Sequence, residues 1–315
     1  MIYLLLVIGF VILVLGADWL VDGATGLARR YHVPDIVIGL TIVAFGTSLP
    51  EFCVNLISTI KGSTELAITN VLGSNIINAC VVLGMSALIW PVASRDRSRH
   101  FDIPLSVLAG ASVLILALVG MPDGRGEHGI TRLGGLILLL ILCFYMYYNM
   151  RHLDRTEEAH GTGRPMPLWK SLGLIVLGLV GLALGAELIV DKATILATQW
   201  GIPQSVIGVT IVALGTSLPE LATSVVAALK HNSDLALGNV VGSNIFNVFL
   251  VLGVSATIRP LPVYDGFVID ALMTTLSCFF IWICTQGRKH TVPRWGGAVL
   301  IVMYGAYLAH LLSNL

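Results

Sequence analysis

The sequence predicts an all-α polytopic membrane protein, with ten transmembrane helices arranged as two inverted five-helix repeats. The first observation is composition. Of the 315 residues, 56% are hydrophobic and 11% are charged, and the mean hydropathy is +0.88. Such values are typical of helical membrane proteins and not of soluble domains. The second observation is the length of the apolar stretches, and the third is a repeat that relates the two halves of the chain.

Ten apolar stretches reach the length of about 20 residues that a transmembrane helix requires. The first one lacks a basic segment before it and a small-residue cleavage site after it, so we interpret it as a retained span and not as a signal peptide. The longest polar stretch, 151–168, is predicted to link a first repeat, 1–150, to a second, 169–315. The predicted spans lie near 2–21, 35–60, 64–90, 101–120, 129–150, 169–190, 203–229, 233–259, 266–286 and 295–314.

The repeat has a constant spacing of 169 residues. Glu51 corresponds to Glu220, and 220 − 51 = 169. Because five spans is an odd number, the second half must enter the membrane in the opposite orientation. Inverted repeats of this kind place a binding site near the bilayer midplane. The same spacing relates Gly16/Gly185, Pro34/Pro203, Gly39/Gly208, Asn70/Asn239, Ser74/Ser243, Asn78/Asn247 and Gly84/Gly253.

The basic residues predict the orientation. Under the ten-span assignment, 13 of the 18 lysines and arginines fall on the side of the 151–168 linker, and 5 fall on the other side. Positive residues accumulate in cytoplasmic loops, so we expect a plasma-membrane protein with a cytoplasmic linker and both termini outside. The formal net charge is zero, so the lipid bilayer is expected as a partner and nucleic acid is not. Nothing in the sequence indicates an obligate protein partner.

The sequence gives no support for enzyme chemistry or for a cofactor. It contains no HExxH or GxSxG motif and no glycine-rich phosphate loop. All five cysteines lie in apolar runs without the spacing of a zinc site. We therefore expect the cysteines to pack as small apolar residues.

Two nearly identical segments that end in a carboxylate carry the chemistry. VIGLTIVAFGTSLPE ends at Glu51 and VIGVTIVALGTSLPE ends at Glu220. A carboxylate within a membrane span is costly and by default marks a functional site. Proline breaks the helical ladder, so we expect freed carbonyl oxygens, for example on Ala44 and Ala213. Hydroxyl oxygens of the same turns come from Thr47, Ser48, Thr216 and Ser217.

Two further motifs, TNVLGSNIIN and GNVVGSNIFN, supply amides and hydroxyls from the third and eighth spans. Ser74 and Asn78 are four residues apart and share a helix face, as do Ser243 and Asn247. With the two carboxylates, these groups predict an oxygen-only site suited to Ca²⁺ and Na⁺ and poor for soft metals. Small polar residues also pack membrane helices together. Packing does not explain a carboxylate at each of two matched kinks.

Acidic residues of the first and sixth spans also match at the repeat spacing. Asp18 corresponds to Glu187, and Asp22 corresponds to Asp191. We expect these four residues to lie toward the membrane interfaces, where headgroups accommodate charge, in preference to positions on an ion pathway.

At these motifs the chain resembles the sodium/calcium exchanger branch of the cation/calcium exchanger superfamily, in its short prokaryotic form. The likeness covers nearly the full length, and the motifs resemble the two alpha-repeats of the family. It implies a secondary antiporter that exchanges Ca²⁺ for Na⁺ by alternating access at a midplane site. It also makes the apolar first and sixth spans candidates to slide across the rest. The ion ligands that it implies are Glu51, Glu220, Asn78, Asn247, Thr47, Ser48, Thr216, Ser217, Ser74, Ser243 and the carbonyls of Ala44 and Ala213.

Some relatives carry Asp where this chain has Asn247, and Asp there is linked in part of the family to potassium dependence. Potassium co-transport is therefore not expected here. The two glutamates alone give the site a charge of −2, which one Ca²⁺, two Na⁺ or two H⁺ would neutralise. An H⁺/Ca²⁺ antiporter of the same fold is an alternative, and a passive cation channel is the alternative from another class. Paired broken helices in an inverted repeat favour the carrier.

Overall fold

The computed structural model describes residues 2–119, 129–151, 166–202, 204–207, 210–211 and 213–313. This part of the chain is built almost wholly from helices, which confirms the predicted all-α membrane fold. Within it, eight helical segments are long and apolar enough to cross a bilayer. A ninth candidate is the bent pair Asp35–Thr47 and Leu49–Lys61. The protein is therefore a multi-pass membrane protein.

The seventh predicted span, 203–229, is described as three helical pieces. These are α10 (Gln204–Ile207), α11 (Ala213–Thr216) and α12 (Leu218–Leu229). Residues 203, 208, 209 and 212 lie outside the described part. So does most of the predicted linker, 152–165, and so do both terminal residues. The repeat boundaries at 150 and 169 stay a prediction.

The helices of the two halves follow one another in the order that the repeat requires. In the first half they are α1 (Ile2–Tyr31), α2 (Asp35–Ile38), η1 (Gly39–Val43), α3 (Ala44–Thr47), α4 (Leu49–Lys61), α5 (Thr64–Ile77), η2 (Asn78–Val82), α6 (Leu83–Ile89), η3 (Ser98–Asp102), α7 (Ile103–Leu118) and α8 (Arg132–Arg151). In the second half α9 (Leu168–Gln199) and α10–α12 are followed by α13 (Ser233–Phe246), η5 (Asn247–Leu252), α14 (Gly253–Ile258), α15 (Phe267–Thr285) and α16 (Arg294–Ser313).

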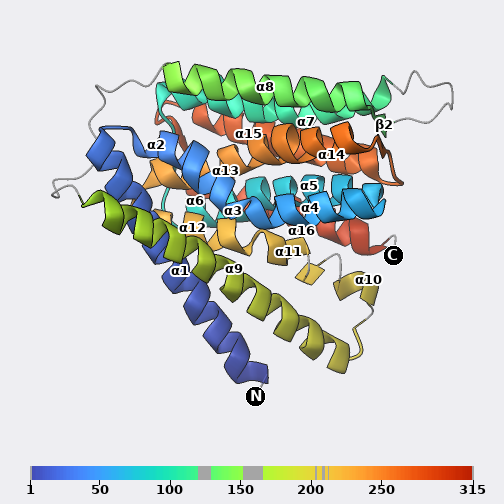
Figure 1. Cartoon of the computed structure of the whole chain (residues 1–315), viewed down its shortest axis with the longest axis horizontal. Coiled ribbons are helices and arrows are strands. Elements are labelled where there is room, and N and C mark those ends of the chain that lie inside the picture. The colour runs from blue at the N-terminus through green and yellow to red at the C-terminus, as the bar shows by residue number, and fades with distance from the viewer. Residues whose placement is uncertain are drawn as a thin grey trace.

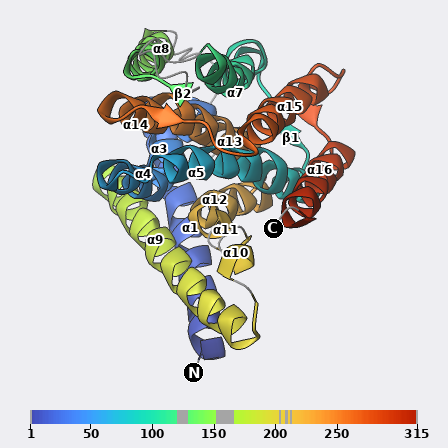
Figure 2. The ribbon, with the colours of Figure 1, turned by 90° about the vertical axis from the view of Figure 1, so that its right-hand side faces the viewer.

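The long helices α1 and α9 form a pair that crosses the other helices obliquely and projects from them, as Figures 1 and 2 show. Glycines bring the two backbones together. A Cβ added to Gly16 would lie 2.7 Å from the backbone N of Leu182, and one added to Gly185 would lie 2.7 Å from that of Leu13. Leu13 and Leu182 are also related by the repeat, since 182 − 13 = 169. The seam between α1 and α9 is therefore itself pseudo-symmetric, and small residues permit the close approach.

The centre of the remaining helices lies between α5 and α13. The spans that contain these two helices are deeply buried. In the span of α13, 94% of the most apolar stretch is buried, and in the span of α5 the share is 72%. Asn75 Nδ2 donates to the backbone oxygen of Asn244 at 3.2 Å, and Asn244 Nδ2 donates to that of Asn75 at 3.5 Å. These two residues are equivalent by the repeat, since 244 − 75 = 169. Their reciprocal bonds place the pseudo-two-fold axis between them, as an inverted repeat requires.

In the described part of the chain, four strands of two residues, which the sequence did not predict, connect loops of the two halves. β1 (Val92–Ala93) pairs antiparallel with β4 (Thr291–Val292), and β2 (Gly129–Ile130) pairs with β3 (Leu261–Pro262). β1 and β3 occupy equivalent positions in the repeat, since 261 − 92 = 169. Each of them pairs with a strand of the opposite half, so the two halves form one body.

Candidate cation site

Each of the two predicted carboxylates lies in the first turn of a helix that follows a break in its span. Ser48 separates α3 from α4 with φ −85° and ψ 3°, and the two parts of this span meet at 45°. Ser217 has nearly the same conformation, φ −92° and ψ 4°, before α12. Glu51 and Glu220 follow these serines and are both 0% exposed. The positive end of a helix dipole favours negative charge at such a position.

The Ala44 carbonyl is not freed by the bend, contrary to the expectation from sequence. It accepts the backbone N–H of Ser48 at 3.1 Å. It also faces the hydroxyls of Thr47 and Ser243, at 3.3 and 3.5 Å. The reason is local, because Pro50 removes only its own N–H and leaves that of Ser48 able to donate. The Ala44 oxygen thus points into the cluster while already carrying partners.

The second half is described less completely at the equivalent position. The backbone N–H of Ser217 donates to Leu214 O at 3.1 Å. The side chain of Ala213, the equivalent of Ala44, lies outside the described part, so the expectation of a freed Ala213 carbonyl stays a prediction.

Hydroxyls from both halves hold Glu220. Ser48 Oγ donates to Glu220 Oε1 at 3.1 Å, and Ser243 Oγ faces the same oxygen at 3.4 Å. Glu220 Oε2 has no hydrogen-bond partner among the described residues. The structure thus brings together three predicted ligands from the second, seventh and eighth spans.

Glu51 has no such support. Neither of its carboxylate oxygens has a hydrogen-bond partner within the described part of the chain, although the side chain is fully buried. Asn55 donates only to the Glu51 backbone oxygen, at 2.8 Å. Glu51 and Glu220 also interact electrostatically. Two buried carboxylates are costly unless positive charge compensates them, and a bound cation would supply that charge.

The predicted amides begin π-helical segments, which sequence reasoning did not foresee. Asn78 is the first residue of η2 and Asn247 the first of η5, and π-bulges are frequent at functional sites. Asn247 Nδ2 donates to Asn75 Oδ1 at 3.1 Å. Its own Oδ1, and both polar atoms of Asn78, lack partners among the described residues. Asn75 was not among the predicted ligands. The signal that could have identified it is its position in the first of the two matched motifs, where it corresponds to Asn244 in the second.

The other predicted hydroxyls divide into two groups. Ser74 and Ser217 are buried, and their Oγ atoms have no partner in the described part. Thr47 donates to Asn239 Oδ1 at 3.1 Å, so it already has a structural role. Thr216 is only partly buried, unlike the equivalent Thr47. A cation at this cluster would find neutral oxygens from both halves around the two carboxylates.

The cluster suits a hard cation and not a soft one. Among the described residues no group of three or more His, Cys, Asp or Glu side chains could hold a metal ion. The available ligands are carboxylate, amide, hydroxyl and carbonyl oxygens, which Ca²⁺ and Na⁺ prefer.

Comparison with known proteins identifies one family over nearly the whole chain. The model of the sodium/calcium exchanger protein family matches residues 1–151 and 170–313. The putative antiporter CaxA of Alkalimonas amylolytica is 36% identical, with 98% of this chain and 97% of CaxA covered. The sodium/calcium exchanger MaX1 of Methanosarcina acetivorans is 33% identical, with 97% of each chain covered. A structure of the sodium-calcium exchanger NCX_Mj, soaked with 10 mM Na⁺ and zero Ca²⁺, matches with a TM-score of 0.83 at 30% identity and covers 98% of this chain and 99% of its own.

Proposed function

The chain belongs to the sodium/calcium exchanger protein family, and on that premise we propose that it is a secondary antiporter exchanging Ca²⁺ for Na⁺ at the cluster around Glu51 and Glu220. The family is one of transporters and not of enzymes. One observation supports the site above all others. Two fully buried carboxylates, one from each half, have three of their four oxygens without a partner in the described part of the chain.

The charge of the cluster supports competition between the two ions. Glu51 and Glu220 contribute −2, and the other proposed ligands are neutral. One Ca²⁺ or two Na⁺ would balance this charge, whereas three Na⁺ would leave +1. Because both ions need the same carboxylates, they are expected to exclude each other and to bind in turn.

The cost of the empty site supports obligatory exchange. Two carboxylates held together in a low dielectric repel each other and lack the water that would solvate them. A change of conformation without a bound cation would incur this electrostatic cost throughout the transition. We therefore propose that the protein changes conformation readily only with Ca²⁺ or with Na⁺ bound, and this couples the two fluxes.

The α1–α9 pair is the proposed moving part. Its pseudo-symmetric glycine seam joins the two helices backbone to backbone, and it crosses the other helices without being threaded among them (Figures 1 and 2). Bodies that slide or rotate as units are a common basis of alternating access. In this proposal the pair moves across a static core that keeps the carboxylates near the midplane.

Calcium uptake into proteoliposomes tests the driving ion. We expect an outward Na⁺ gradient to drive ⁴⁵Ca²⁺ accumulation, and an outward H⁺ gradient without Na⁺ to drive none. Accumulation driven by H⁺ alone would favour the H⁺/Ca²⁺ antiporter of the same fold. Calcium entry that follows only its own gradient, with no counter-ion requirement, would indicate the passive channel and contradict exchange.

The orientation is a further part of the proposal. We propose that both termini lie outside and that the 151–168 linker is cytoplasmic, because of the 13 to 5 split of basic residues. Single cysteines at positions 2, 160 and 314, in a background without native cysteines, test it with a membrane-impermeant thiol reagent on intact cells. We expect labelling at both ends and none at 160. Labelling at 160, or at one end only, would contradict the inverted arrangement.

A further inference from the structure

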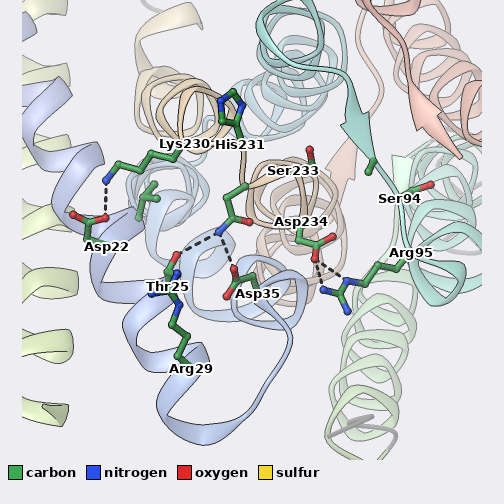
Figure 3. A pocket seen from close by; sticks show the side chains of 13 residues that line it. Asp22, Thr25, Arg29, Asp35, Ser94, Arg95, Lys230, His231, Ser233 and Asp234 are labelled. Atoms are coloured by element: carbon green, nitrogen blue, oxygen red, sulfur yellow. Dashed lines mark hydrogen bonds and ion pairs between the residues drawn. The ribbon is translucent and has the colours of Figure 1, made fainter. Parts of the chain in front are cut away.

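A lysine at the end of α12 ties the moving pair to the core. Lys230 Nζ lies 2.6 Å from Asp18 Oδ1 and 2.6 Å from Asp22 Oδ1, both on α1. Figure 3 shows the Lys230–Asp22 contact at the edge of a polar pocket of about 530 Å³. The two aspartates were expected to lie toward a membrane interface, and that position stays a prediction. Because α1 packs against α12, both also pair with the lysine that follows α12.

A second link lies beside the first. Asn232 Nδ2 donates to Asp35 Oδ2 at 2.8 Å and to Thr25 Oγ1 of α1 at 3.3 Å. The Asn232 Oδ1 atom accepts the Leu235 N–H and so caps α13. Partial burial alone would lower the pKa of Lys230, but its hydrogen bonds with Asp18 and Asp22 raise the pKa above its ordinary value. The lysine therefore stays charged at neutral pH.

The repeat places the same kinds of charged side chain on the other face of the molecule. Lys230 corresponds to Lys61, Asp18 to Glu187 and Asp22 to Asp191, since 230 − 61, 187 − 18 and 191 − 22 all equal 169. A lysine after the broken span and two acids on a long helix thus occur twice, with their charges preserved.

The second set is open in this conformation. Lys61, Glu187 and Asp191 are all exposed. Asp191 pairs with its own neighbour, Lys192, at 2.6 Å. Within the described part of the chain, neither Lys61 nor Glu187 has a hydrogen bond or an ion pair.

The loops around the two lysines are nevertheless alike. The rings of Trp90 and His231 lie 4.0 Å apart between centroids. Their equivalents also meet, because a Cβ added to Gly62 would lie 2.5 Å from Arg259 Nη1. The spacing is the same, since 259 − 90 and 231 − 62 both equal 169. The core helices and the α1–α9 seam are each pseudo-symmetric. The difference between the two faces therefore lies in the position of the α1–α9 pair relative to the core.

We propose that two latches close in alternation, Lys230 with Asp18 and Asp22 on one face, and Lys61 with Glu187 and Asp191 on the other. The inference rests on the proposed function, because alternating access requires that each face can close. Since the glycine seam joins α1 and α9, drawing α1 onto the Lys230 face withdraws α9 from the Lys61 face. Applying the repeat symmetry to the described conformation yields the state with the second latch closed. Partly exposed ion pairs are individually weak, which suits contacts that break in every cycle.

Distances between spin labels in nanodiscs test the latches without any transport measurement. One label pair, at Arg30 and Ala93, spans the Lys230 face. The other, at Gln199 and Glu65, spans the Lys61 face, and all four residues are exposed in the structure. We expect Lys230→Gln to shift the population roughly two- to tenfold toward a wider first distance and a shorter second distance. Lys61→Gln should shift it by a similar factor in the opposite direction.

Two variants serve as controls. Lys289→Gln removes an exposed lysine from the face expected to include Lys230 and should leave both distances unchanged. Lys230→Arg keeps the charge, so it should retain the unmutated distribution and show that folding at this position tolerates change. Shifts in the same direction for Lys230→Gln and Lys61→Gln, or a shift no larger than that of Lys289→Gln in either, would overturn the proposal. Because the distances are measured without any ion flux, such a result would not contradict the exchange function. Failure of exchange in vesicles, in turn, would not alter the measured distances.

Discussion

Glu51 and Glu220 end almost the same sequence, yet their carboxylates have different surroundings. Glu220 Oε1 faces the hydroxyls of Ser48 and Ser243, whereas both Glu51 oxygens lack a partner in the described part of the chain. The acidic residues of the long helices differ in the same way. Asp18 and Asp22 meet Lys230, and their equivalents on α9 do not meet Lys61.

This contrast shows what an inverted repeat can and cannot impose. Equivalent residues supply equivalent chemical groups, but one chain in one conformation need not use both sets alike. If one face of an exchanger is closed while the other is open, its two halves are necessarily in different states. The unequal hydrogen bonding of the two glutamates is the expected local sign of such a state.

The largest effect is expected from removing either carboxylate. Glu51→Gln and Glu220→Gln should each lower Na⁺-driven calcium uptake by about 100-fold or more, because loss of one charged partner of a buried ion costs about 3–5 kcal/mol. Uptake in proteoliposomes at matched protein content measures this. Glu65→Gln, at an exposed position of α5, is the matched control and should transport normally. If only one of the two site variants lost transport, the shared site would be wrong.

An intermediate effect is expected at the seam between α1 and α9. Gly16→Ala and Gly185→Ala each place a methyl group 2.7 Å from a backbone nitrogen of the other helix. Either change should destabilise the protein by about 1–3 kcal/mol and slow exchange. Thermal unfolding in detergent and initial uptake rates measure the two consequences. Gly173→Ala, on the same helix as Gly185 but with nothing within 4 Å of the new Cβ, should change neither. Equal behaviour of all three variants would rule out a tight seam.

The smallest effect should separate the two halves. Ser48→Ala removes a hydroxyl that donates to Glu220 and should lower the free energy of unfolding by about 1 kcal/mol. Ser217→Ala, at the equivalent position, removes a hydroxyl without a partner among the described residues, so its change should stay within about 0.5 kcal/mol. Chemical unfolding in choline buffer, without Na⁺ or Ca²⁺, makes the comparison. Equal losses would mean that the halves are not in different states.

Much of the site could be predicted from sequence because its signals are local. A proline before a glutamate within an apolar run implies a broken span with a buried carboxylate, and the helix breaks at Ser48 and Ser217 bear this out. The expectation of a free Ala44 carbonyl was wrong because proline removes only its own N–H, and the Ser48 N–H still reaches Ala44. The π-turns that begin at Asn78 and Asn247 could not be foreseen, since no residue pattern distinguishes them from ordinary helix.

The sequence by itself determined the membrane class, the inverted repeat and the chemical groups available to a cation, because composition, span length and residue spacing are properties of the chain alone. Only the tertiary structure decided which of the equivalent groups are paired. Asn75 meets Asn244, and Lys230 meets Asp18, across 169 and 212 residues of chain. Such contacts depend on how the α1–α9 pair rests on the core. A symmetric sequence permits two such placements, and each conformation contains only one of them.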